Sequence, residues 1–264
     1  MNIIDFKNMK EAKRKISMIT CYDHWSAQIV NQSNVDCILV GDSAAMVIHG
    51  HGTTLPATVE MMLQHIYAVA KGAPQKFIVG DMPFCSYRKG LSQTMETVDQ
   101  MMKAGSHAIK LEGADDNADI ITHIVKSGIP VMGHIGLTPQ SVHALGGFKV
   151  QGKNQQAADK ILEQALALQD AGCFSLVLEC IPYTLAEKIT QSLTIPTIGI
   201  GAGPFTDGQV LVLQDMLGLQ THQPKFLKKF MEGFTLIKDT LDQYDSEVKS
   251  QSFPSKEHCY EYSS

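Results

Sequence analysis

The stretch Cys37-Ile38-Leu39-Val40-Gly41-Asp42-Ser43 joins a short apolar run to a glycine, a carboxylate and a hydroxyl. Related runs occur at Phe77-Ile78-Val79-Gly80-Asp81, at Ala108-Ile109-Lys110-Leu111-Glu112-Gly113 and at Leu176-Val177-Leu178-Glu179-Cys180. Runs of this length that are rich in Val, Ile and Leu and apolar on both faces are typical of buried parallel strands. The four runs therefore predict an α/β fold built on a parallel sheet.

Each of these runs delivers an acid at its carboxyl end. In a barrel of parallel strands, the carboxyl ends form the face where chemistry takes place. A single aspartate after a strand is more often a helix cap or a turn residue. Four acids in the same position relative to their strands favour one shared pocket, formed by Asp42, Asp81, Glu112 and Glu179.

Strands and helices are predicted to alternate along the chain at about 25–35 residues per unit, which gives close to eight βα units. That is the pattern of a (β/α)8 TIM barrel. Glycines near positions 72, 105, 128 and 172 suit the ends of the intervening helices. The strands are expected at residues 16–21, 36–41, 76–80, 107–111, 130–134, 174–178, 195–200 and 210–213.

The predicted organisation is one barrel domain over residues 1–264, with a short polar helical arm at 1–15 and a polar tail at 245–264. A long amphipathic helix is expected over 226–244. The alternative fold is a doubly wound open sheet, but the G-x-G-x-G run at 199–203 is followed by Pro204 where a dinucleotide fingerprint needs its third glycine. In the arm, solvent-facing side chains are expected for Lys10, Lys13, Arg14 and Lys15.

The composition argues against several classes of protein. The formal net charge of -5, with no long Lys/Arg run, argues against a nucleic-acid partner. The six cysteines form no C-x-x-C pair, so reduced thiols and a cytoplasmic location are expected. No signal peptide is evident, and no apolar run approaches the roughly 18 residues of a membrane span.

Clustered acids need a compensating charge. Two carboxylates about 4 Å apart repel by roughly 4 kcal/mol at an effective dielectric near 20. Without compensation, one of them takes up a proton. A divalent cation is the natural compensation, and a site with only oxygen ligands suits Mg²⁺, which keeps water or substrate oxygens in its shell.

Other polar residues near this face have two interpretations each. Lys110 shares a strand face with Glu112, and it either binds a substrate carboxylate or pairs with one of the acids. His134 ends the fifth strand as a proton donor or as a hydrogen-bonded rim histidine. His49 and His51 form an H-x-H pattern that suits a metal, a substrate lid or simple solvation. Cys180 lacks the signature of a nucleophile and is interpreted as structural.

Taken together, these segments resemble the ketopantoate hydroxymethyltransferase family, from about residue 16 to residue 230. The motifs that carry the resemblance are Val40-Gly41-Asp42-Ser43, Gly50-His51-Gly52-Thr53-Thr54-Leu55-Pro56, Gly80-Asp81-Met82-Pro83-Phe84, Ile109-Lys110-Leu111-Glu112-Gly113, the segment 133–141, the segment 146–152, Leu178-Glu179-Cys180-Ile181-Pro182 and Ile198-Gly199-Ile200-Gly201-Ala202-Gly203.

The resemblance implies a barrel of the phosphoenolpyruvate mutase and isocitrate lyase type. It implies Mg²⁺ held at Asp42, Asp81 and Glu112, and a 2-oxo acid, 3-methyl-2-oxobutanoate, that chelates the metal. It further implies that 5,10-methylenetetrahydrofolate donates a hydroxymethyl group to give 2-dehydropantoate for pantothenate and coenzyme A biosynthesis. The family forms large homo-oligomers, commonly homodecamers.

The resemblance also assigns roles to single residues. Glu179 is expected to act as the general base. The substrate is expected to be bound by Asp42, Ser43, Asp81, Lys110 and His134. The chain departs from the family at Pro204 and Gln214, which puts loop contacts after the seventh strand in question. The rival functions are a Mg²⁺-dependent 2-oxo acid lyase on the same barrel and a non-catalytic keto-acid-binding protein.

Overall fold

The strands close into a single parallel barrel. The computed structural model describes residues 1–220 and 224–262. Each of its eight strands pairs in parallel with its neighbours in chain order, and the last strand pairs with the first. The strands are β1 (Ile16–Thr20), β2 (Cys37–Val40), β3 (Phe77–Asp81), β4 (Ala108–Glu112), β5 (Val131–Gly136), β6 (Ser175–Glu179), β7 (Thr197–Ile200) and β8 (Gly208–Leu211).

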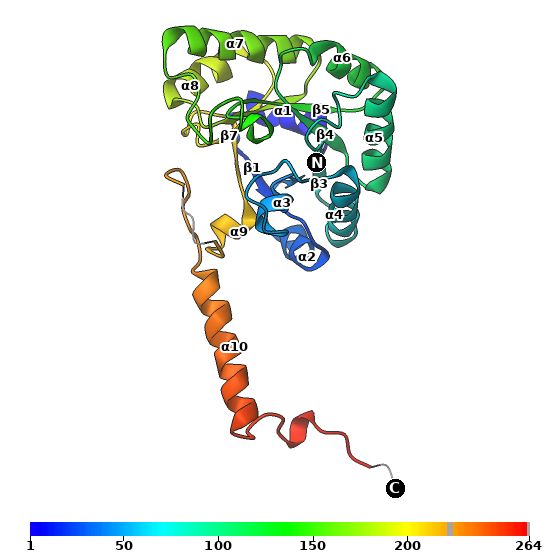
Figure 1. Cartoon of the computed structure of the whole chain (residues 1–264), viewed down its shortest axis with the longest axis vertical. Helices are drawn as coiled ribbons and strands as arrows, with labels where there is room; N and C mark the ends of the chain where they lie inside the picture. The colour runs from blue at the N-terminus through cyan, green and yellow to red at the C-terminus, as the bar shows by residue number, and fades with distance from the viewer. Residues whose placement is uncertain (221–223, 263–264) are drawn as a thin grey trace. The chain divides into compact units, whose positions relative to one another are not determined.

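Helices follow the first six strands and surround the barrel (Figure 1). The loop 201–207 joins β7 directly to β8. The helices are α1 (Ile3–Glu11), α2 (His24–Gln32), α3 (Ala44–Val47), α4 (Val59–Gly72), α5 (Leu91–Ala104), α6 (Ala118–Lys126), α7 (Gln155–Asp170), α8 (Tyr183–Ser192), α9 (Leu213–Met216) and α10 (Gly233–Lys249), with short 3-10 turns at Pro139–Ser141 (η1) and Lys256–His258 (η2).

The predicted (β/α)8 barrel is confirmed, and the closed sheet excludes the doubly wound alternative. The sequence prediction was wrong at some element ends. Strand β8 begins two residues before its predicted start, and α10 begins at Gly233 instead of residue 226. The structure also contains two elements that the sequence analysis did not predict, the helix α3 after β2 and the turn η1 after β5.

The amino end of the barrel is closed by α1, the blue helix near the centre of Figure 1. Phe6 is fully buried and packs edge-on against Phe77 and Phe174, with ring centroids 5.4 and 5.1 Å away. Met9 joins the same apolar cluster inside the barrel. Because both side chains enter the core, the arm is part of the barrel's packing.

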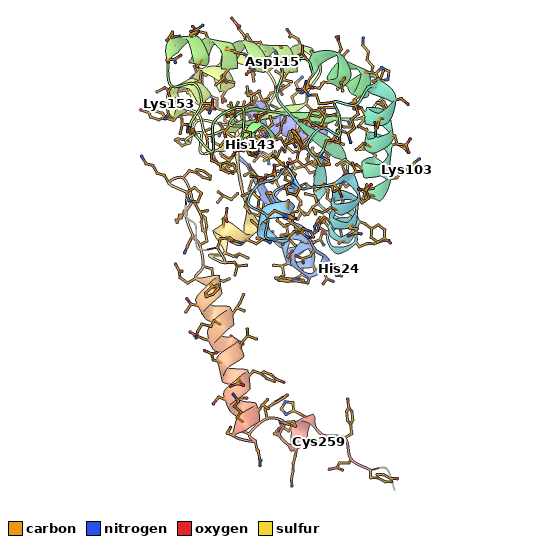
Figure 2. All side chains as sticks on the ribbon, viewed as in Figure 1. His24, Lys103, Asp115, His143, Lys153 and Cys259 are labelled. Atoms are coloured by element: carbon orange, nitrogen blue, oxygen red, sulfur yellow. The ribbon has the colours of Figure 1, made fainter. Side chains whose placement is uncertain are left out.

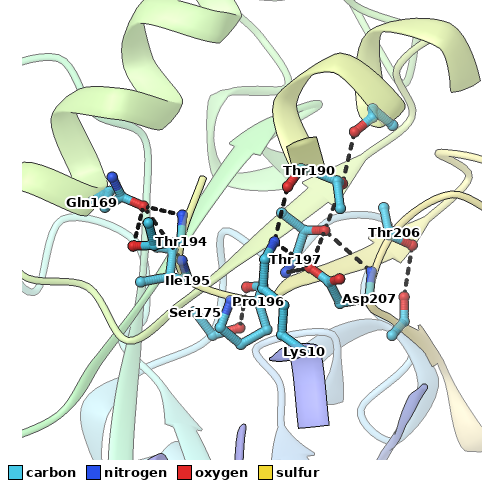
Figure 3. Close-up of polar contacts among 12 residues, drawn as sticks. Lys10, Gln169, Ser175, Thr190, Thr194, Ile195, Pro196, Thr197, Thr206 and Asp207 are labelled. Atoms are coloured by element: carbon cyan, nitrogen blue, oxygen red, sulfur yellow. Dashed lines mark hydrogen bonds and ion pairs between the residues drawn. The ribbon is translucent and has the colours of Figure 1, made fainter. Parts of the chain in front are cut away.

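The predicted solvent exposure of Lys10 is therefore wrong. Its ammonium group is 2.8 Å from Asp207, and it donates a hydrogen bond of 2.9 Å to the carbonyl oxygen of Thr190 (Figure 3). The Asp207 carboxylate also accepts hydrogen bonds from the backbone N–H and the hydroxyl of Thr197, at 2.9 and 3.2 Å. Lys13, Arg14 and Lys15 are exposed as predicted, although Lys15 also donates to the carbonyl of Thr206.

The chain divides into two compact units, residues 1–213 and 214–264. The barrel strands belong to the first unit, and the second contains α10, most of α9 and the turn η2. One face of α10 carries exposed apolar side chains that include Phe234, Ile237 and Leu241. The prediction of a single domain over 1–264 stays a prediction. Over the described residues, no helix has the length and apolar character that crossing a membrane requires.

Candidate active site

Strand register brings the predicted polar residues to the carboxyl end of the barrel. Asp81 on β3 pairs with Lys110 on β4, and Glu112 on β4 pairs with His134 on β5. Residues that pair across neighbouring strands share a face of the sheet, so the four side chains point the same way. All four are buried, with 1–3% of their surface exposed.

Lys110 lies among the acids. Its ammonium nitrogen is 2.8 Å from Asp81 Oδ1 and 3.7 Å from Glu112 Oε1. Burial alone would lower the pKa of Lys110, but the charges of Asp81, Glu112 and Asp42 outweigh that effect and raise it above its ordinary value. Lys110 is therefore a fixed positive charge at the centre of the site.

Asp42 is the acid whose charged form is most strongly disfavoured by its surroundings. Burial and the charges of Asp81 and Glu112 raise the pKa of Asp42 well above its ordinary value. Its Oδ2 accepts one hydrogen bond of 2.9 Å from the side-chain amide of Gln140, and its backbone N–H donates to Asp81 Oδ2 at 3.2 Å. Burial likewise raises the pKa of Asp81, and Lys110 offsets that rise only in part.

Gln140 is a site residue that the sequence reasoning missed. Besides its bond to Asp42, its amide donates to the carbonyl of Met82 at 2.9 Å, and its backbone N–H donates to Glu112 Oε2 at 2.9 Å. Tyr87 donates its hydroxyl to the amide oxygen of Gln140 at 2.8 Å. Gln140 lies in a segment that looks like a polar loop. The one sequence signal that could have found it is its place in the family motif at residues 133–141.

His134 connects two of the acids. Its Nδ1 is 3.2 Å from Glu112 Oε1, and its Nε2 is 3.1 Å from Glu179 Oε2. Burial and the nearby Lys110 would lower the pKa of His134, but Glu112 and Glu179 raise it to about 9. In turn, the positive charges of His134 and Lys110 lower the pKa of Glu112, although its burial would raise it.

Glu179 and Ser43 lie at the edges of this cluster. The Glu179 side chain is 16% exposed, whereas those of Asp81 and Glu112 are 2% exposed, so Glu179 is the acid that solvent reaches. The Ser43 hydroxyl is 2.8 Å from the Tyr22 hydroxyl. Both residues are thus less deeply buried than Asp81 and Glu112.

The donor set fits a divalent cation, but not in its present arrangement. No group of three histidine, cysteine or acidic side chains in the described chain is placed to hold a metal ion as it stands. Three buried carboxylates, Asp42, Asp81 and Glu112, nevertheless share one ammonium group. Oxygen-only donors of this kind suit Mg²⁺, and Asp42, Asp81 and Glu112 are the residues that would hold such an ion.

A cavity of about 640 Å³ adjoins this cluster. Glu112 and Gln140 form part of its wall, and the rest is mixed, with apolar side chains such as Phe84 and Ile161 among polar and charged ones. Arg88 and Lys160 lie at this cavity, and both contact Asp115, which Figure 2 labels beside α7. The volume of the cavity lies within the range of about 300–1,000 Å³ that is usual for small-molecule sites.

The structure separates the remaining candidates from this site. His51 is exposed, and His49 contacts His65 on α4 instead of a site residue. Burial, with the charge of Glu179, raises the pKa of the Cys180 thiol to about 12, which fits its interpretation as structural. Pro204 is exposed in the loop after β7, and Gln214 lies in α9.

Two solved structures share this fold. The 2,3-dimethylmalate lyase, described as a member of the PEP mutase/isocitrate lyase superfamily, matches with a TM-score of 0.62 and 15% identity over 97% of this chain and 91% of that chain. Phosphoenolpyruvate phosphomutase from Streptomyces platensis subsp. rosaceus matches with a TM-score of 0.65 and 12% identity over 99% and 92%. The predicted barrel type is confirmed, and identities this low show the fold alone.

Sequence relatives are much closer. The 3-methyl-2-oxobutanoate hydroxymethyltransferase of Coxiella burnetii (strain CbuG_Q212) is 65% identical over 263 residues, which cover 98% of this chain and 99% of that protein. The protein of the same name from Bdellovibrio bacteriovorus (strain ATCC 15356 / DSM 50701 / NCIMB 9529 / HD100) is 59% identical over 259 residues, or 98% of each chain. A family model described as ketopantoate hydroxymethyltransferase matches residues 1–256. The chain therefore belongs to the ketopantoate hydroxymethyltransferase family.

Proposed function

We propose that this chain is an enzyme that transfers a hydroxymethyl group from 5,10-methylenetetrahydrofolate to 3-methyl-2-oxobutanoate, giving 2-dehydropantoate for pantothenate biosynthesis. The full-length match to relatives of that name supports the substrate. The observation that carries the chemistry is the buried cluster of Lys110 and His134 with three carboxylates, next to the more exposed Glu179. So many uncompensated charges in one buried cluster are typical of a functional site and not of a purely structural one.

The keto acid would enter as an anion, and Lys110 is the group that offsets its carboxylate. In the free site Lys110 is bound to Asp81. A divalent cation such as Mg²⁺, held by Asp42, Asp81 and Glu112, would draw negative charge from the ketone and stabilise the deprotonated substrate. Lys110 would turn its ammonium group from Asp81 toward the substrate carboxylate. Ser43 would donate its hydroxyl to the same anion.

Glu179 is assigned as the general base. It would take the proton from C3 of the keto acid, the carbon between the ketone and the two methyl groups. His134, 3.1 Å from the Glu179 carboxylate, holds that side chain in place. The carbanion then forms the new carbon–carbon bond with the methylene carbon of the donor. Both bonds from that carbon to the donor's nitrogens break. One water is consumed, its oxygen becomes the new hydroxyl, and the two nitrogens take up the C3 proton and one water proton, so that tetrahydrofolate leaves.

The cavity beside Glu112 is assigned to the folate. It borders Glu112 and Gln140, so a ligand there lies next to the keto-acid site. Its apolar side chains suit a flat heteroaromatic ring. Its wall holds two cations, Arg88 and Lys160, and two acids, Glu112 and Asp115. Because Lys110 and His134 already compensate Glu112, the two cations suit the carboxylates of a glutamyl tail. Arg88→Ala should therefore raise KM for the donor and leave KM for the keto acid unchanged.

Two further properties belong to the same proposal. The protein works as a homo-oligomer, and the resemblance to the family implies a decamer. The exposed apolar side chains of α10 support self-association. The reaction takes place in the cytoplasm, which suits a chain whose six cysteines are all free. Light scattering of the purified chain tests the first property, because a monomer at micromolar concentration would contradict it.

Exchange of the C3 proton tests the function itself. With Mg²⁺ in deuterated water, the wild-type chain should wash the C3 proton out of 3-methyl-2-oxobutanoate, as followed by proton NMR. Glu179→Gln keeps the shape of the side chain and removes the base, so exchange and turnover should fall together by about 10²–10⁴-fold. The control is Glu163→Gln, an exposed glutamate on α7, which should leave both rates unchanged.

Each other outcome points elsewhere. Normal exchange without product in Glu179→Gln would move Glu179 to a later step and make His134 the candidate base. Cleavage of a 2-oxo acid without use of folate would identify a lyase. Binding of the keto acid with no exchange in the wild type would identify a binding protein.

A further inference from the structure

Two histidines outside the site contact each other through their imidazole rings. His49 follows α3 in the segment between β2 and α4, and His65 lies on α4. Their Nε2 atoms are 2.9 Å apart, and the ring planes are inclined at 67°. His49 is exposed and His65 is half-buried, so solvent reaches the space between them.

The contact of His65 Nδ1 with a backbone carbonyl fixes the tautomer of His65. His65 Nδ1 lies 2.6 Å from the backbone carbonyl oxygen of Tyr22. A carbonyl oxygen can only accept, so Nδ1 must carry the hydrogen, and the lone pair of Nε2 then accepts the hydrogen bond from His49 Nε2. A metal ion would take the place of that shared hydrogen. Metal-binding histidines typically have this arrangement, in which a backbone carbonyl takes one N–H and the other nitrogen faces the metal.

The spacing of the two nitrogens is close to that of a metal-bound pair. Zinc–imidazole bonds of about 2.0–2.1 Å at a tetrahedral angle place two nitrogens roughly 3.3 Å apart. The pair must therefore open by only a few tenths of an ångström from 2.9 Å. The His49 side chain is exposed, and Gly50, which follows it, has a φ of +75° and open space beside it.

We propose that His49 and His65 form a second metal site, separate from the carboxylate cluster, for a transition-metal ion that prefers imidazole. Zn²⁺, Cu²⁺ and Ni²⁺ have this preference, whereas Mg²⁺ prefers oxygen ligands. Two protein nitrogens bind the ion, and water completes its shell. Occupation ties the segment after α3 to α4. Ser43 directly precedes α3, and its hydroxyl contacts Tyr22, the residue whose backbone carbonyl contacts His65.

The test uses Cu²⁺ added to the full chain in excess Mg²⁺, which occupies oxygen-only sites. The background is Cys259→Ser, because Cys259 (labelled in Figure 2) is an exposed thiol beside His258. Electron paramagnetic resonance should show one tight equivalent of Cu²⁺ with coupling to two nitrogens. Calorimetry with Zn²⁺ should show one site of the same stoichiometry.

Single substitutions decide which nitrogens are involved. His49→Gln removes an exposed ligand without disturbing the core, and it should weaken binding by about tenfold or more. His65→Gln should do the same. The matched control is His51→Gln, because His51 is the exposed partner of the H-x-H pattern and should not contribute. Loss of the two-nitrogen signal in His51→Gln, or its survival in His49→Gln, would overturn the proposal.

Discussion

The two ends of the barrel each hold a lysine whose ammonium group is 2.8 Å from a carboxylate, yet the two sites do different things. At the amino end Lys10 meets one acid, Asp207, and a backbone carbonyl, while the Asp207 carboxylate also accepts two hydrogen bonds from Thr197 (Figure 3). Charges and hydrogen bonds balance there.

At the carboxyl end, Lys110 meets Asp81, with Asp42 and Glu112 close enough to shift its pKa. The acids there outnumber the lysine, and among the described residues His134 is the group that adds a further positive charge. Like charges that crowd together cost stability unless a ligand compensates them. The difference teaches that the same ion pair stabilises the fold where it is balanced and prepares for a ligand where it is not.

Of the variants that test this comparison, Lys110→Ala should have the largest effect. Loss of the cation that offsets the substrate carboxylate should cost about 3 kcal/mol, on the order of 100-fold in KM for the keto acid, with a smaller change in kcat. Steady-state kinetics measure both constants. Lys103→Ala, which removes an exposed lysine on α5, is the control. An unchanged KM would mean that Lys110 only balances the acids, as Lys10 balances Asp207.

Gln140→Leu should have the next largest effect. The leucine cannot donate to Asp42 or accept from Tyr87, so Asp42 loses its positioning, and affinity for a divalent ion should fall about 10–100-fold. Titration with Mn²⁺, followed by electron paramagnetic resonance, measures the affinity without any turnover. Gln164→Leu, at the same cavity, is the control. Equal affinities would show that Gln140 supports the loop and not the acids.

Lys10→Met should lower stability without touching the chemistry. Asp207 keeps its bonds to Thr197 but loses its charged partner, which should cost about 1.5–3 kcal/mol of unfolding free energy in urea. Lys7→Met is the matched control on the same helix, since Lys7 and its partner Glu11 are 66% and 64% exposed. If both variants lose equal stability, the effect belongs to α1 in general and the balance described for Asp207 is wrong.

Asp42→Asn should change stability in the opposite direction. It removes one of the crowded charges and keeps an oxygen for the Gln140 amide, so the metal-free protein should gain about 1 kcal/mol. Added Mg²⁺ should then raise the melting temperature of the wild type more than that of the variant, because a ligand stabilises the state that binds it. Lower stability in the metal-free variant would show that Asp42 is already compensated.

Much of this molecule followed from local patterns in the sequence. Buried strands appear as short apolar runs, and alternation along a strand fixes which side chains share a face, so Lys110 and Glu112 were predicted to point together. The position of each acid at the end of its strand placed Asp81, Glu112 and Glu179 at one rim. The ends of β8 and α10 were less well predicted, because helix and strand ends depend on tertiary contacts more than on propensity.

The sequence by itself determined the barrel and the acids that meet at its carboxyl end. Only the tertiary structure decided which partners balance them. Gln140 is separated from Asp42 by 98 positions, and Lys10 from Asp207 by 197. Neither pair leaves a periodic signal, because a pattern records the face on which a side chain lies and not the distant segment that it meets there. The pairing of His49 with His65, and not with His51, was decided in the same way when α4 packed beside the loop after β2.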